Sequence, residues 1–119
     1  MKKLFVLSAL MLLVGCAEKA PLTPEQQWQG YCKSVGNAAR TILLDRQNSS
    51  EKQAAIDHAN KIEDPTTKKF ILEIIEEVYQ LPSAQLNDNP TEQREKIRAQ
   101  VTERCQSTPF DEIPEYKPF

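Results

Sequence analysis

Few residues of this chain have the types and spacing that catalysis requires. His58 is the only histidine, and hydrolytic or metal sites built on imidazole ordinarily use a second histidine or a neighbouring nucleophile. A nucleophilic pair of Cys32 with His58 is formally available. The simpler interpretation is that His58 is a solvated residue at the edge of a short helix.

Three neighbouring glutamates, Glu73, Glu76 and Glu77, are a second candidate, because paired carboxylates can act as general acid and base or hold a cation. They fall opposite an apolar stripe, which favours a solvated acidic face or a contact surface for a basic partner. The sequence contains no nucleophile elbow, HExxH zinc motif, phosphate loop or glycine-rich dinucleotide turn. We therefore expect no enzymatic activity, no metal and no cofactor.

The first fifteen residues have the order of a secretory signal peptide. Lys2 and Lys3 give a positive start, residues 4–14 are almost wholly apolar, and the small Gly15 follows. As a helix, residues 4–14 would span about 16 Å, short of the roughly 30 Å hydrocarbon core of a bilayer. We expect residues 1–15 to be cleaved off rather than to stay as a transmembrane helix.

The junction Leu13-Val14-Gly15-Cys16 resembles the lipobox of bacterial lipoproteins. The resemblance implies cleavage by signal peptidase II before Cys16, whose thiol carries a diacylglycerol and whose amino group carries a fatty acid such as palmitate. Several chains anchor a protein firmly, whereas a single chain binds a membrane only marginally. The protein would then be held at the membrane by its own lipid anchor, and residues 16–22 would form a short tether between this anchor and the folded domain.

The residue after Cys16 implies the destination. Ala17 stands where an inner-membrane retention signal usually has Asp, so the resemblance implies the outer membrane, facing the periplasm. The alternative is an ordinary signal peptide cleaved near Ala17 or Ala20, which leaves a soluble protein with an unmodified thiol.

Loss of residues 1–15 leaves 104 residues, which is enough for one small domain. Cleavage also removes Lys2 and Lys3, so the mature chain has 13 basic and 17 acidic residues and a formal charge of −4. Such a surface has no electrostatic reason to bind nucleic acid or anionic lipid. We expect an envelope protein as the partner and no nucleic acid.

Two cysteines remain once Cys16 is lipidated. In the oxidising periplasm Cys32 and Cys105 are expected to form a disulfide, worth roughly 4 kcal/mol in the chain-entropy model. The alternative is a reactive or metal-binding pair, but neither residue belongs to a C-x-x-C motif.

Four segments begin with residues that start helices. These starts are Thr23-Pro24-Glu25-Gln26, Ser50-Glu51-Lys52-Gln53, Asp64-Pro65 and Asn89-Pro90. We expect helices over about residues 24–46, 51–62, 65–81 and 90–106, each with apolar residues at three- and four-residue steps. The expected stripes are Trp28, Tyr31, Cys32, Val35, Ala38, Ala39, Ile42 and Leu43; Ala55, Ala59 and Ile62; Phe70, Ile71, Ile74, Ile75, Val78 and Leu81; and Ile97, Val101 and Cys105.

Two details of these stripes predict how the helices meet. Cys105 ends the narrow stripe of the last helix, so it faces the core and the first helix. Gly36 lies inside the first helix at a helical cost, which predicts close approach of a neighbouring backbone there.

The sequence thus predicts an all-α fold: a small four-helix bundle, orthogonal or up-down, over residues 23–107, with one disulfide. Residues 108–119 contain three prolines and form an extended tail. Four apolar residues of the tail recur every three residues, the period of a polyproline II helix, and so share one edge. That edge either packs on the bundle or contacts a partner protein; it consists of Phe110, Ile113, Tyr116 and Phe119.

The mature region also resembles small, exported, helical proteins of proteobacteria that pair an early and a late cysteine. The resemblance is carried by Cys32 with Ala38-Ala39, Asp45-Arg46-Gln47, Val78-Tyr79 before Leu81-Pro82, and Cys105. It implies a fold and no reaction. We expect a non-catalytic lipoprotein that binds another protein. The alternatives are an immunity or inhibitor protein against a periplasmic effector and a small envelope hydrolase.

Overall fold

The structure, a computed structural model, describes residues 21–109. These residues form four α-helices and no strand: α1 (Pro24–Gln47), α2 (Lys52–Ala59), α3 (Pro65–Gln80) and α4 (Pro90–Gln106), with a short 3-10 helix η1 (Ser83–Gln85) before α4. The predicted all-α four-helix bundle is confirmed. Residues 1–20, with Cys16, lie outside the described part, as do the tail residues Phe110, Ile113, Tyr116 and Phe119.

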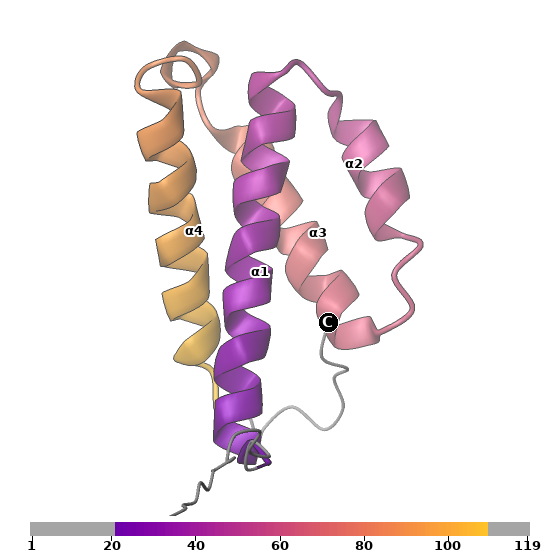
Figure 1. Cartoon of the computed structure of the whole chain (residues 1–119). Helices are drawn as coiled ribbons and strands as arrows, with labels where there is room; N and C mark the ends of the chain where they lie inside the picture. The colour runs from indigo at the N-terminus through magenta and orange to yellow at the C-terminus, as the bar shows by residue number, and fades with distance from the viewer. Residues whose placement is uncertain (1–20, 110–119) are drawn as a thin grey trace, which may run out of the picture.

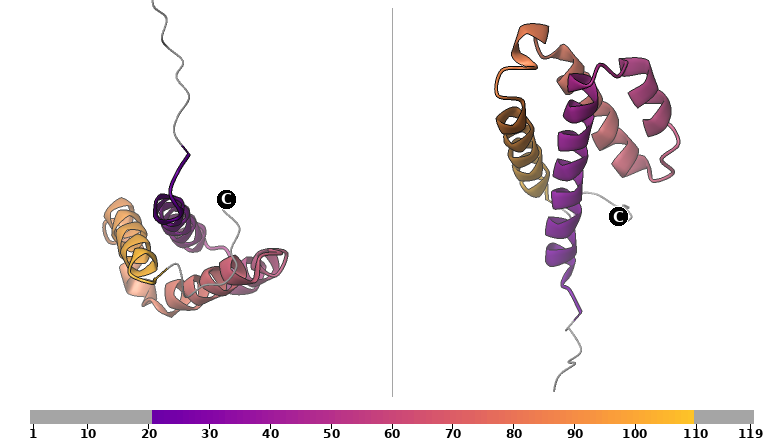
Figure 2. Two further views of the ribbon diagram at one scale, coloured as in Figure 1. Left: turned by 90° about the horizontal axis from the view of Figure 1, so that it is seen from below. Right: turned by 45° about the horizontal axis from the view of Figure 1, so that its top comes forward.

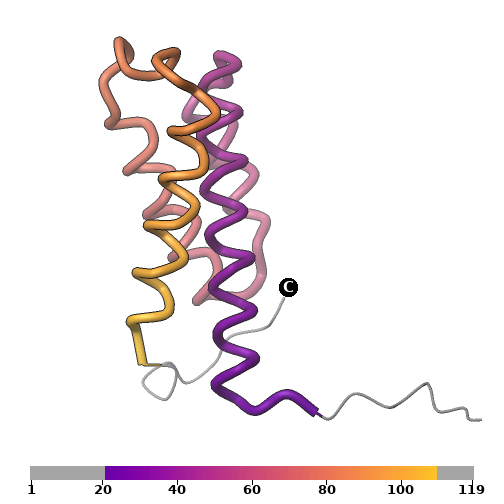
Figure 3. The backbone as a smooth tube through the Cα atoms, turned by 60° about the vertical axis from the view of Figure 1, so that its left-hand side comes forward, coloured from indigo at the N-terminus to yellow at the C-terminus, as the bar shows by residue number. Residues whose placement is uncertain are grey.

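Successive helices run in alternating directions, so the bundle is of the up-down kind (Figure 1). Helix α1 packs against both α4 and α3, and α2 packs against α3. Seen from below, α1 and α4 lie beside each other, and α3 with α2 forms a second layer (Figure 2). The first and last helices in the sequence, α1 and α4, run side by side over the length of α4 (Figure 3). This pairing brings Cys32 and Cys105 together.

The starts of α1 and α3 are those predicted. The backbone N–H of Gln26 donates to the Thr23 hydroxyl at 3.1 Å, and that of Thr23 donates to the Gln26 side chain at 3.0 Å, which completes the capping box. The Asp64 carboxylate accepts from the N–H of Thr67 at 3.0 Å, and Pro65 occupies the first position of α3.

The predicted cap of α2 is wrong. Glu51, not Ser50, precedes the helix, and no side chain caps it. Ser49 adopts a left-handed conformation with φ of 71°, which turns the chain so that Ser50 closes α1 with a hydrogen bond to the carbonyl of Asp45. The carbonyl of Ser50 meanwhile accepts from the Tyr79 hydroxyl at 2.8 Å.

Another expected boundary and another expected cap differ from the structure. Helix α2 ends at Ala59, three residues early, because the N–H of Ile62 bonds to the carbonyl of Ala59 in a tighter turn. Asn89 precedes α4 as predicted, but its φ of 51° is left-handed and its side chain makes no capping bond. Asparagine tolerates this conformation, so it serves there to reverse the chain.

The core follows the predicted stripes. Helix α3 buries Ile71, Ile74, Ile75 and Val78, while α4 buries only the three residues of its narrow stripe. Of the predicted α2 stripe only Ala59 is buried, so this helix contributes little to the core. The buried residues of α1 are Trp28, Tyr31, Cys32, Val35, Gly36, Ala39 and Leu43.

Candidate functional site

The disulfide clamps α1 to α4. Cys32 and Cys105 are bonded, with their Cα atoms 5.4 Å apart, and both side chains are buried. One turn away, a Cβ at Gly36 would lie 1.9 Å from the hydroxyl of Thr102 and 2.8 Å from the carbonyl oxygen of Arg98. The predicted disulfide and the predicted close approach at Gly36 are both confirmed. Burial of both sulfurs makes this pair a structural one.

An aromatic cluster lies near the disulfide, between α1 and α3. The rings of Trp28 and Tyr31 stack with centroids 5.1 Å apart, and Phe70 stands at an angle to both, at 6.4 and 6.3 Å. Beneath them, the Thr67 hydroxyl donates to Asp64 at 2.5 Å, so the Tyr31 hydroxyl, 2.7 Å from Thr67, must donate to Thr67. This series of hydrogen bonds, from Tyr31 through Thr67 to Asp64, links α1 to the start of α3.

The candidate catalytic residues do not come together. His58 is exposed on α2, and Cys32 is held in the disulfide. Glu76 pairs with Lys52 at 2.9 Å, and Glu77 with Arg104 at 2.7 Å. Among residues 21–109 no group of three or more histidine, cysteine and carboxylate side chains is arranged to hold a metal. Two of the three glutamates of α3, Glu76 and Glu77, therefore act as ion-pair partners of neighbouring helices.

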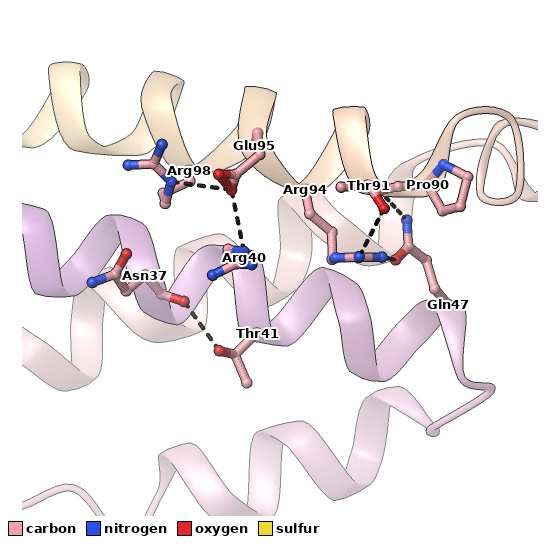
Figure 4. A network of polar contacts seen from close by, with 9 residues as sticks. All are labelled: Asn37, Arg40, Thr41, Gln47, Pro90, Thr91, Arg94, Glu95 and Arg98. Carbon is pink, nitrogen blue, oxygen red and sulfur yellow. Dashed lines mark hydrogen bonds and ion pairs between the residues drawn. The ribbon is translucent and has the colours of Figure 1, made fainter.

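A polar network joins the C-terminal half of α1 to the N-terminal half of α4 (Figure 4). Arg40 on α1 and Arg98 on α4 both contact Glu95, at 3.2 and 3.3 Å. The hydrogen bond from Arg98 lowers the pKa of the Glu95 carboxyl, and the positive charges of Arg98, Arg40 and Arg94 lower it further. Arg94 also donates to the Gln47 side chain at 2.7 Å.

Arg46 and Tyr79 close the end of α1 against α3. Arg46 donates to the carbonyl of Val78, and its guanidinium lies 5.4 Å from the centre of the Tyr79 ring. Partial burial raises the pKa of Tyr79 above its ordinary value, and the negative charge of Asp45 adds to this rise. Both residues were part of the sequence resemblance, and here they fix the turn between α1 and α2.

A cleft of about 380 Å³ opens between α3 and α4 at the end of the bundle where the loop 81–89 joins them. It exists because α3 and α4 each pack on α1 and make few close contacts with each other. Its apolar lining comes from Leu43, which is buried, from the half-buried Leu81 and from Ile97. Its polar lining comes from Glu77, Gln85, Asp88, Gln93, Lys96 and Gln100.

Sequence reasoning did not find this cleft. Gln93 donates to the carbonyls of Gln85 and Asp88 and so holds the loop together. Gln47 reaches from α1 to the carbonyls of Leu86 and Pro90, 3.2 Å away in each case. The sequence alone does not distinguish a glutamine that makes such long-range contacts from one that is exposed to solvent.

Comparisons with protein-family models, curated proteins and solved structures found no match to this chain. Within residues 21–109, no helix combines the length and the apolar character that a membrane crossing needs.

Proposed function

We propose that the protein is a lipoprotein held by Cys16 in a bacterial outer membrane, facing the periplasm, and that it binds another envelope protein without catalysing a reaction. The buried bond between Cys32 and Cys105 carries this proposal. Disulfides persist in oxidising compartments, and a lipobox directs a protein to such a compartment. The ion pairs of Glu76 and Glu77 argue against their use as a general acid and base, because each carboxylate is engaged by a basic side chain of another helix.

Mass spectrometry of the protein purified from membranes of a Gram-negative host tests the anchor. We expect a mature chain that begins at Cys16 and carries a diacylglycerol and a fatty acid. The matched control is Cys16→Ala, which keeps the rest of the leader and should yield no lipidated species. A wild-type chain that begins elsewhere, or that starts at Cys16 with a free thiol, would refute the proposal.

The tail is the candidate contact surface for the partner. Removal of residues 108–119 should abolish cross-linking to an envelope protein while leaving the melting temperature unchanged, if Phe110, Ile113, Tyr116 and Phe119 contact that partner. If the tail instead packs on its own bundle, truncation lowers the melting temperature. Full cross-linking by the truncated chain would move the contact surface to the helices.

A further inference from the structure

We propose that the cleft between α3 and α4 binds a short peptide with free ends and apolar side chains, of two or three residues. This inference does not depend on the lipid anchor or on the partner protein. The cleft's volume of about 380 Å³ lies at the small end of the range for ligand sites in proteins. It therefore suits a ligand of a few residues rather than a larger molecule.

The lining of the cleft matches each part of such a ligand. Leu43, Leu81 and Ile97 give an apolar floor for its side chains. The side-chain amides of Gln85 and Gln100 make no hydrogen bond within residues 21–109, so they remain available to donate to a peptide carbonyl and to accept from a peptide N–H.

The lining of the cleft carries charges of both signs. Lys96 and Asp88 both line it, and neither makes an ion pair or side-chain hydrogen bond in the described residues. The third charged residue, Glu77, is already neutralised by Arg104. One unpaired charge of each sign favours a ligand with one ammonium and one carboxylate over a ligand of a single sign.

The cleft is held in shape before any ligand arrives. Gln93 on α4 bonds to two carbonyls of the loop, and Gln47 on α1 bonds to a third and to the carbonyl of Pro90. Arg94 in turn donates to the side chain of Gln47. A site with walls already fixed loses less conformational freedom on binding. This order supports a binding site rather than an incidental gap between helices.

Two-dimensional NMR of the purified full chain in detergent tests the proposal with leucyl-leucine as the probe. We expect saturable shifts at Leu43, Leu81, Ile97 and the loop between α3 and α4. Acetylation of the probe's amine or amidation of its carboxylate should each weaken binding by about five- to tenfold, because each removes one charge-assisted contact.

Variants assign each charge. Lys96→Met should weaken the binding of leucyl-leucine by about fivefold but have little effect on the amidated probe, which has no carboxylate for Lys96 to contact. Asp88→Asn should likewise weaken the binding of leucyl-leucine by about fivefold but have little effect on the acetylated probe, which has no ammonium for Asp88 to contact. The exposed Lys33→Met and Glu63→Gln, which lie outside the cleft, are the matched controls.

Three results would overturn the proposal: no saturable shift at millimolar probe, shifts centred elsewhere, or equal binding of the doubly blocked probe. Gln100→Trp, a change at an exposed position of the rim, should fill the cleft and abolish binding while preserving the helical circular dichroism signal. Failure here leaves the anchor proposal untouched, because that rests on mass spectrometry of Cys16.

Discussion

The contact at Gly36 gives the sharpest test of how α1 meets α4. In Gly36→Ala the new Cβ would stand 2.8 Å from the carbonyl oxygen of Arg98, about 0.6 Å inside the 3.4 Å at which ordinary contact begins. The Thr102 hydroxyl, at 1.9 Å, can rotate away, but a helix carbonyl cannot. The disulfide one turn away resists a simple separation of the helices. Overpacking of this kind costs about 1–3 kcal/mol, while alanine regains about 1 kcal/mol of helix propensity.

We therefore expect Gly36→Ala to lower the free energy of unfolding by about 0–2 kcal/mol, measured by urea unfolding followed by circular dichroism with the disulfide intact. Gly30→Ala is the matched control, because it makes the same change in the same helix, where a Cβ meets nothing within 4 Å. It should stabilise the protein by about 0.5–1 kcal/mol. Equal effects of the two substitutions, or a gain at position 36, would mean that α4 does not approach α1 closely there.

Three further predictions concern stability. Replacing Cys32 and Cys105 together with alanine should cost about 4 kcal/mol in urea unfolding, because the bond links residues 73 apart in sequence. Thr67→Val removes the buried hydrogen bond between Tyr31 and Thr67 and should cost about 1–3 kcal/mol, and adding Tyr31→Phe should recover part of that loss. Since the pKa of Tyr79 is raised in the fold, the Tyr79 hydroxyl loses its proton at a lower pH in the unfolded chain than in the folded one. The stabilising contribution of Tyr79 is complete below pH 10.0 and is lost as the pH rises through its folded pKa. Urea midpoints should therefore fall less steeply above pH 10.0 in Tyr79→Phe.

The parts of the fold that the sequence predicted are those fixed by local chemistry. Thr23 and Asp64 cap their helices with side chains that lie only three residues from their partners. The buried stripes of α3 and α4 follow from helical periodicity, and the position of Cys105 on its stripe placed the disulfide on the correct face. Gly36 was informative because a glycine inside a helix needs a reason.

The parts that were missed depend on residues far apart in sequence. Ser50 was expected to cap α2, yet its backbone bonds to Asp45 and Tyr79 instead. The cleft between α3 and α4 depends on the distances at which two helices settle on a third, which periodicity does not determine. The glutamines that hold its loop, Gln47 and Gln93, carry no local signal of their role.

Helix α4 is held in place by means other than a large apolar face. It buries only Ile97, Val101 and Cys105, so the disulfide fixes its C-terminal end and the network around Gln47 and Arg94 fixes its N-terminal end. Helix α3 is held on α1 by apolar burial instead. Because α3 and α4 each pack mainly on α1, and not closely on each other, the gap between them stays open as a cleft. Solvents that compete for hydrogen bonds, such as urea below the unfolding midpoint, should therefore loosen the cleft end of α4 before the disulfide end.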